Sequence, residues 1–96
     1  MKIKEGYVLR EAANQFEVVP KGEELFNLKA IITLNPSGKF IWDKMQQEVD
    51  VRDLVEFMLK KYDISEVRAH QDILEFIEIL QSKNLIDFYG RQNSFY

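Results

Sequence analysis

The sequence predicts an α+β fold, with an N-terminal three-stranded antiparallel sheet followed by three helices. Short runs rich in β-branched and aromatic residues fill the first third of the chain, as is typical of strands. Apolar residues recur at spacings of three and four over the remainder, as is typical of amphipathic helices. The 96 residues, 46% of them hydrophobic, suffice for one packed core. We therefore expect one domain over 1–96, with a loose tail at 90–96.

The predicted sheet begins with a hairpin of Tyr7–Glu11 and Phe16–Val19. The residues between these runs include Asn14, which suits a left-handed turn position. Ala30–Leu34 is the third predicted strand, because three of its residues are β-branched. Before it, Leu25–Leu28 is either a further short strand or an apolar loop that packs on the core.

The first predicted helix runs from Pro36 to about Gln47, since Asn35 can cap its free amides and proline suits its first position. Trp42 lies beside its apolar stripe and is expected in the core. The second helix opens at Asp50, which is a good N-cap residue.

The third predicted helix starts at a Ser65 cap and ends at Asn84, which suits a left-handed C-terminal cap. Its apolar stripe has a centre and two flanks on a helical wheel. The centre is Ile73, Ile77 and Leu80, one flank is Val67 and Leu74, and the other is Ala69 and Phe76. Ile79 lies outside the stripe, beyond Phe76. Either Ile79 is a single exposed apolar residue, or Phe76 and Ile79 form the wall of a groove for an extended peptide. Residues 85–89 add a short terminal strand.

Composition and motifs exclude several classes of function. A formal charge of −3 gives no general attraction to nucleic acid or anionic membrane, and the absence of cysteine excludes disulfides and thiolate metal sites. No apolar run suits secretion or a membrane span, so a cytoplasmic protein is expected. His70 lies near the core stripe and is predicted to be a partly buried structural residue. Glu75 and Glu78 are most simply a solvated surface, so we expect no catalytic residues, no cofactor and no metal.

Several fragments, in this order and spacing, resemble one known family. The most recognisable is Leu34-Asn35-Pro36-Ser37-Gly38 followed by Phe40-Ile41-Trp42. Tyr7-Val8-Leu9-Arg10-Glu11 precedes it, and Ala69-x-x-Asp72-Ile73-x-x-Phe76-Ile77 follows it. The order of strands and helices is that of a winged helix-turn-helix-like domain, and residues 7–86 resemble the PqqD-like family. Its members are recognition elements for the leader segments of ribosomally synthesised, modified peptides.

The resemblance implies a function and a site. A non-catalytic domain of this kind binds the leader of a precursor peptide as an added strand. It presents that precursor to a maturation enzyme, such as a radical-SAM protein or a lasso-peptide leader protease. The implied peptide-binding residues are Ile31, Ile32, Thr33 and Leu34 on the strand edge, and Asp72, Phe76 and Ile79 on the third helix. The chain departs from the family in two places: Asn84 stands where glycine is usual, and 21–29 is longer than in the shortest members.

A winged-helix DNA-binding transcriptional regulator is the alternative function. Its recognition helix would be the third one, which carries four acidic residues against two basic residues. A helix that enters the major groove should present positive charge to the phosphates, so the balance argues against DNA binding. A purely structural subunit of a larger complex stays open, and so does the oligomeric state.

Overall fold

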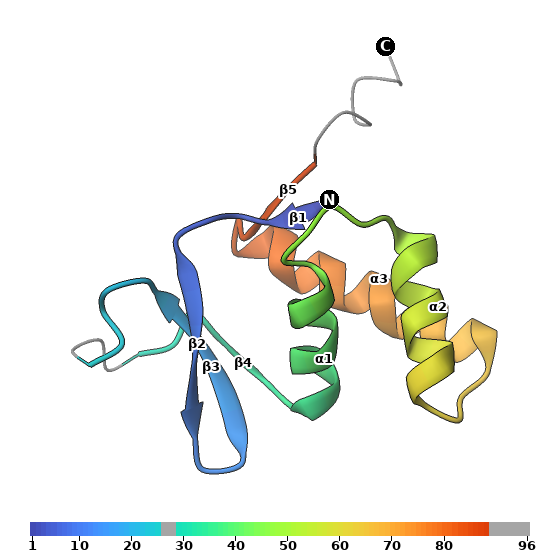
Figure 1. Ribbon diagram of the computed structural model, residues 1–96, viewed down its shortest axis with the longest axis horizontal. Helices are drawn as coiled ribbons and strands as arrows, with labels where there is room; N and C mark the ends of the chain where they lie inside the picture. Colours follow the sequence, from blue (N-terminus) through green and yellow to red (C-terminus); the bar gives the residue numbers. More distant parts are fainter. Residues whose placement is uncertain (26–28, 89–96) are drawn as a thin grey trace.

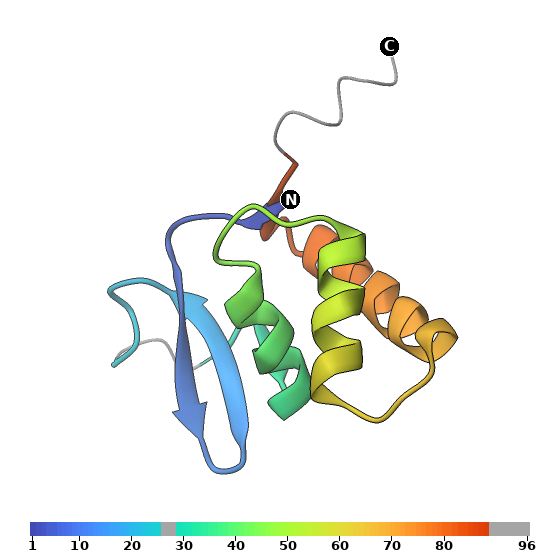
Figure 2. The same cartoon turned by 45° about the vertical axis from the view of Figure 1, so that its right-hand side comes forward.

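The computed structural model describes residues 1–25 and 29–88, and it confirms the α+β architecture (Figure 1). The described residues form a three-stranded antiparallel sheet in the order β2-β3-β4, a two-stranded sheet of β1 and β5, and three helices. In chain order these are β1 (Lys2–Ile3), β2 (Tyr7–Ala12), β3 (Gln15–Pro20), β4 (Ile32–Leu34), α1 (Pro36–Lys44), α2 (Val51–Lys61), α3 (Glu66–Ser82) and β5 (Ile86–Asp87). In Figure 2, α1 lies between the three-stranded sheet and α2, and α3 lies behind α2.

The predicted hairpin is confirmed, but its left-handed residue is not the predicted one. Strands β2 and β3 pair as far as Ala12 and Gln15, which leaves only two residues in the turn. Ala13 has a φ of 56°, whereas Asn14 is not among the residues with positive φ. A two-residue hairpin turn of type II′ needs positive φ at its first central position, so the short loop places Ala13 there. Of the predicted Leu25–Leu28 segment, 26–28 lie outside the described residues.

The third strand of the sheet is shorter than predicted. It covers Ile32–Leu34 and not Ala30–Leu34, and it pairs with β3 alone among the described residues. Ile31 still contacts the sheet, because its amide donates a hydrogen bond of 2.8 Å to the carbonyl of Val18. The sheet order therefore makes β4 an edge strand, although 21–29 is longer than in the shortest family members.

Helix α1 begins as predicted and ends early. Asn35 caps it, because its side-chain oxygen accepts a hydrogen bond of 2.8 Å from the amide of Gly38. The helix ends at Lys44, before the predicted Gln47. Met45, which is fully buried, accepts a hydrogen bond of 2.8 Å from the amide of Ile3. In a longer helix the Met45 carbonyl would accept from the amide of Val49, but that amide donates to the carbonyl of Met1 at 3.0 Å, so the N-terminal segment replaces the hydrogen bonds of the next turn.

Helix α2 begins with a capping box. The amide of Asp53 donates to the Asp50 carboxylate at 2.8 Å, and the amide of Asp50 donates to the Asp53 carboxylate at 3.0 Å. Both residues are exposed.

Replacing Asp50 with alanine removes one side of this box, and we expect the free energy of unfolding to fall by about 1 kcal/mol. Urea denaturation followed by circular dichroism measures the change. Asp50→Asn keeps an oxygen acceptor and is the matched control, because asparagine is an equally good cap. Equal stability of the alanine and asparagine variants would show that the cap contributes nothing.

Helix α3 confirms its predicted ends. Ser65 accepts a hydrogen bond of 3.1 Å from the amide of Arg68, and Asn84 has a left-handed φ of 58°. The prediction for His70 is wrong, since its side chain is exposed. The flank predicted to carry Val67 and Leu74 is exposed with it, at 70% and 49%. The helix contacts the core over a narrower stripe than its apolar pattern suggests, centred on the predicted isoleucines and Leu80.

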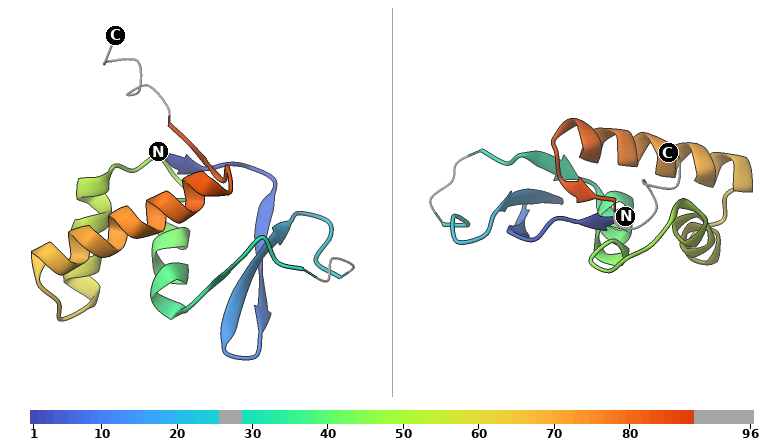
Figure 3. Two further views of the ribbon diagram at one scale, coloured as in Figure 1. Left: turned by 180° about the vertical axis from the view of Figure 1, so that it is seen from behind. Right: turned by 90° about the horizontal axis from the view of Figure 1, so that it is seen from above.

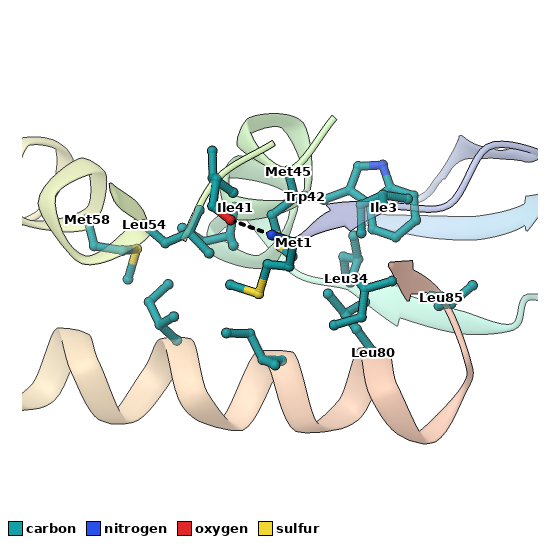
Figure 4. Packing of buried hydrophobic residues seen from close by; sticks show 14 of the residues in the cluster. Met1, Ile3, Leu34, Ile41, Trp42, Met45, Leu54, Met58, Leu80 and Leu85 are labelled. Carbon is teal, nitrogen blue, oxygen red and sulfur yellow. Dashed lines mark hydrogen bonds between the residues drawn. The ribbon is translucent and has the colours of Figure 1, made fainter. Parts of the chain in front are cut away.

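The core lies between α3 and the layer formed by α1, α2 and the sheets (Figure 4). Trp42 is 3% exposed, which confirms its predicted place in the core. Strand β1 was not predicted, yet Met1 and Ile3 are buried and Ile3 pairs with Ile86. The predicted strand at 85–89 is observed as Ile86–Asp87, and residue 89 lies outside the described residues.

Candidate functional site

The outer edge of β4 carries main-chain groups that face away from the sheet. Hydrogen-bonded and non-hydrogen-bonded pairs alternate along an antiparallel ladder. The amide of Lys21 donates to the carbonyl of Gly6 at 2.8 Å, one pair beyond the end of the β2–β3 register. Counting pairs from there, Glu17 directs its main-chain groups toward β2, and Val18 directs its own toward β4.

The same alternation fixes the orientation of Thr33. Val18 is opposite Ile32 and Glu17 is opposite Thr33 in the β3–β4 register. The carbonyl of Val18 does accept a hydrogen bond of 2.8 Å from this side, from the amide of Ile31, which directly precedes β4. Glu17 and Thr33 are consequently a non-hydrogen-bonded pair, so the amide and carbonyl of Thr33 point outward along the open edge of the sheet.

Helix α3 lies on the side of the sheet that carries this edge (Figure 3, left). Side chains from α3 and β4 line a common groove. One hollow of about 160 Å³ is lined by both elements and by the start of α1. An adjoining hollow of about 290 Å³ continues along α3 and shares Phe76 and Ile79 with it. Phe76 is half-buried, whereas Ile79 is 48% exposed. We call the two hollows together the β4–α3 groove.

Most of the predicted site residues meet in this groove. The smaller hollow is lined by Ile32, Thr33, Leu34, Phe76 and Ile79 among others. Asp72 lines the larger hollow. Ile31 lines neither hollow, and its half-buried side chain packs against the core. The first-turn residues of α1 that line both hollows were not predicted as site residues.

Asn35 and Gly38 are the missed residues of this groove. A Cβ atom on Gly38 would lie 3.3 Å from the side-chain oxygen of Asn35 and 3.4 Å from Cβ of Leu34. Glycine therefore lets the first turn of α1 approach the end of β4 closely. The signal was present in the Leu34–Gly38 fragment, which carried the family resemblance, but within it only Leu34 was assigned a role in binding.

Charged residues lie along the α3 wall. Arg68 donates to the Asp72 carboxylate at 3.1 Å, one helical turn away, and Glu75 is exposed nearby in the larger hollow. An exposed pair of this kind contributes little to stability. Among residues 1–25 and 29–88, no group of three or more His, Cys, Asp or Glu side chains is placed to hold a metal ion. The groove offers main-chain hydrogen-bonding groups, an apolar wall and a few exposed charges.

Comparisons with known proteins identify the family and the fold. The sequence model of the family described as coenzyme PQQ synthesis protein D (PqqD) matches residues 24–86, well over half of the chain. The chain belongs to the PqqD family. The matched region includes β4 and the whole of α3, but not the hairpin, which also carried part of the resemblance. No curated protein matches the chain.

One solved structure supports the fold. The structure titled "TbiB1 in Complex with the TbiA(beta) Leader Peptide" is similar to this chain, with a TM-score of 0.69 and 18% sequence identity. The similarity covers 94% of this chain and 99% of that one. At this identity the likeness shows the fold alone, an α+β fold with a three-stranded antiparallel sheet and three helices. No helix in the described part of the chain is both long and apolar enough to cross a membrane.

Proposed function

We propose that this protein binds the leader segment of a ribosomally synthesised precursor peptide as an added strand along β4. Membership of the PqqD family supports the proposal, and so does the fold shared with TbiB1, a protein solved with a leader peptide. The observation that carries it is the outward-facing main chain of Thr33, opposite the Phe76 and Ile79 wall. Such an edge is a hazard for aggregation unless a cognate strand covers it.

Two kinds of contact are expected in the groove: main-chain hydrogen bonds that provide affinity, and side-chain contacts that provide selectivity. Within the predicted Ile31–Leu34 edge, an added strand forms main-chain hydrogen bonds with the outward groups of Thr33, and these depend little on the leader's sequence. Side chains alternate along that strand, so every second one faces α3. Phe76 and Ile79 then select an apolar leader side chain, while Asp72 lies farther along the same wall. We infer that the domain is non-catalytic and presents the bound precursor to a modifying enzyme or leader protease.

Helix α3 provides a matched pair of variants for testing this assignment. Ile79 and Leu74 are 48% and 49% exposed, but only Ile79 lines the groove. We expect Ile79→Ala and Phe76→Ala each to weaken leader binding by about tenfold, the usual cost of removing an anchoring contact. Leu74→Ala is expected to change affinity by less than about twofold. The probe is the fluorescently labelled leader segment of a short precursor peptide, to be sought among the open reading frames around this gene, and its titration is read by anisotropy.

Amide chemical shifts of isotope-labelled protein locate the bound leader independently. Shifts should concentrate in 31–38 and 72–79. Shifts along β2, which is the other edge of the three-stranded sheet, would place the added strand on the wrong side. Equal effects of Ile79→Ala and Leu74→Ala would contradict the groove assignment.

A further inference from the structure

A second surface, formed by α1 and α2, combines lysine ammonium groups with aromatic rings. Nζ of Lys44 lies 4.6 Å from the ring centroid of Phe57 and 5.3 Å from that of Phe40. Nζ of Lys61 lies 5.7 Å from the Phe40 centroid, and Tyr62 packs edge-on against Phe40 with centroids 5.8 Å apart. We call these five residues the lysine–aromatic surface.

The two lysines of this surface carry charge that no carboxylate neutralises within 1–25 and 29–88. Neither forms an ion pair there, whereas the neighbouring Lys39 pairs with Asp43 at 2.6 Å. Lys60 adds a further positive charge in the last turn of α2. Glu56 and Asp63 are next in sequence to the aromatic residues of this surface, and neither forms an ion pair within the described residues. Three lysine ammonium groups therefore lie here without a paired carboxylate from the described part of the chain.

Contacts with the rings hold these ammonium groups in place. An ammonium group over an aromatic face is attracted by the ring quadrupole, by about 0.5–1 kcal/mol at an exposed site. The rings of Phe40, Phe57 and Tyr62 are half-buried and fixed by the core. Side chains oriented in this way lose less conformational freedom when they bind an anion than free lysines do.

The lysine–aromatic surface is separate from the β4–α3 groove. The first turn of α1 lines the groove, but Phe40 and Lys44 do not line either hollow. Seen from above in Figure 3, α3 lies on one side of the molecule and α1 and α2 lie on the other. A leader in the groove and a ligand on this surface can therefore be bound together.

We propose that the lysine–aromatic surface docks an acidic segment of a protein partner, with carboxylates paired to Lys44 and Lys61. Charge complementarity carries this assignment, since opposite potentials steer and orient protein association. A membrane fits less well, because the rings are half-buried and the large exposed apolar side chains, such as Leu59 and Val67, are outside this surface. Nucleic acid also fits less well. A long polyanion would reach beyond this surface by more than the screening distance of about 8 Å, and there it would be repelled by the rest of the protein, whose net charge is negative.

The test uses the whole chain and a defined probe. The probe is a short capped peptide of glutamate and tyrosine residues, and its counterpart has lysine in place of glutamate. We expect saturable binding of the acidic peptide alone, with amide shifts confined to 39–44 and 57–62. Reversing both charges, in Lys44→Glu/Lys61→Glu, should weaken binding by about tenfold or more.

A second double variant, Lys21→Glu/Lys83→Glu, is the matched control, because it makes the same change in net charge at exposed lysines elsewhere. Its affinity for the acidic peptide should stay within about twofold of the parent. Equal losses in both double variants would overturn the proposal, and so would shifts spread over all lysines. Tighter binding of duplex DNA or of anionic vesicles would overturn it in favour of those ligands.

Binding of an acidic segment at the lysine–aromatic surface can be tested independently of leader binding in the β4–α3 groove. Lys44→Glu/Lys61→Glu should bind the leader as the parent does, and Ile79→Ala should bind the acidic peptide as the parent does. A failure of either ligand to bind would thus contradict one proposal and leave the other intact.

Discussion

Replacing Trp42 with alanine is expected to lower the free energy of unfolding by about 3–5 kcal/mol. The indole is 3% exposed and packs within a cluster that α1, α2, α3 and both sheets share. Its removal loses apolar contact and leaves a cavity that the surrounding helices cannot fully close. A small domain has about 5–15 kcal/mol of stability in total, so this one change removes a large part of it.

Urea denaturation followed by circular dichroism measures this effect, with Leu74→Ala as the control. Leu74 is 49% exposed, so its truncation should cost well under about 1 kcal/mol. If the Trp42 variant does not fold at all, Trp42→Phe retains most of the apolar volume and should give an intermediate loss. A fully stable Trp42→Ala protein would show that the indole does not occupy the core.

Replacing Thr33 with proline is expected to weaken leader binding by about tenfold or more. Proline removes the outward amide that the register assigns to Thr33, and its ring occupies the space of an incoming carbonyl. One main-chain hydrogen bond is worth about 0.5–1.5 kcal/mol net, and the steric contact adds to the loss. The fold should tolerate the change, because an edge strand accepts proline where the N–H faces away from the ladder.

Thr33→Val is the matched control, since valine keeps the amide and the branched shape. It should bind the leader within about twofold of the parent. Thermal unfolding of both variants establishes that β4 is still in place. A proline variant that is folded and binds with unchanged affinity would place the added strand elsewhere, and β2 would be the next candidate edge.

The helix starts were predictable because capping depends on residues close together in the sequence. Asn35, Asp50 and Ser65 each accept a hydrogen bond from an amide three residues later, so their side chains act within one turn. The left-handed φ of Asn84 follows from the same local chemistry.

Features that depend on distant partners could not be predicted in this way. Helix α1 stops at Lys44 because the carbonyl of Met45 bonds to the amide of Ile3, which is far away in sequence. Ala13 has a positive φ because the strands pair right up to the turn, against its own preference. His70 is exposed because only part of the apolar face of α3 contacts the core, and His70 lies outside that part.

The candidate site was predictable in part. Phe76 and Ile79 were expected to form a wall from the helical wheel and the resemblance, and the structure places them beside β4. Asn35 and Gly38 were missed as lining residues because a sequence shows their capping role and not the space around them. The lysine–aromatic surface was also missed, since Lys44 and Lys61 come from different helices and meet only in the folded chain.

The pairing of β1 with β5 has a consequence for how this domain combines with others. Lys2 lies opposite Asp87, so the two ends of the described chain run side by side, at the end of the molecule away from the β2–β3 turn (Figure 1). A domain with adjacent ends can be inserted into a surface loop of another protein without stretching either side. Reopening the chain at the Ala13 turn would leave every helix and strand whole, but a linker that joins the two ends has to keep the nitrogen of Met1 as a donor to the carbonyl of Val49, 2.8 Å away.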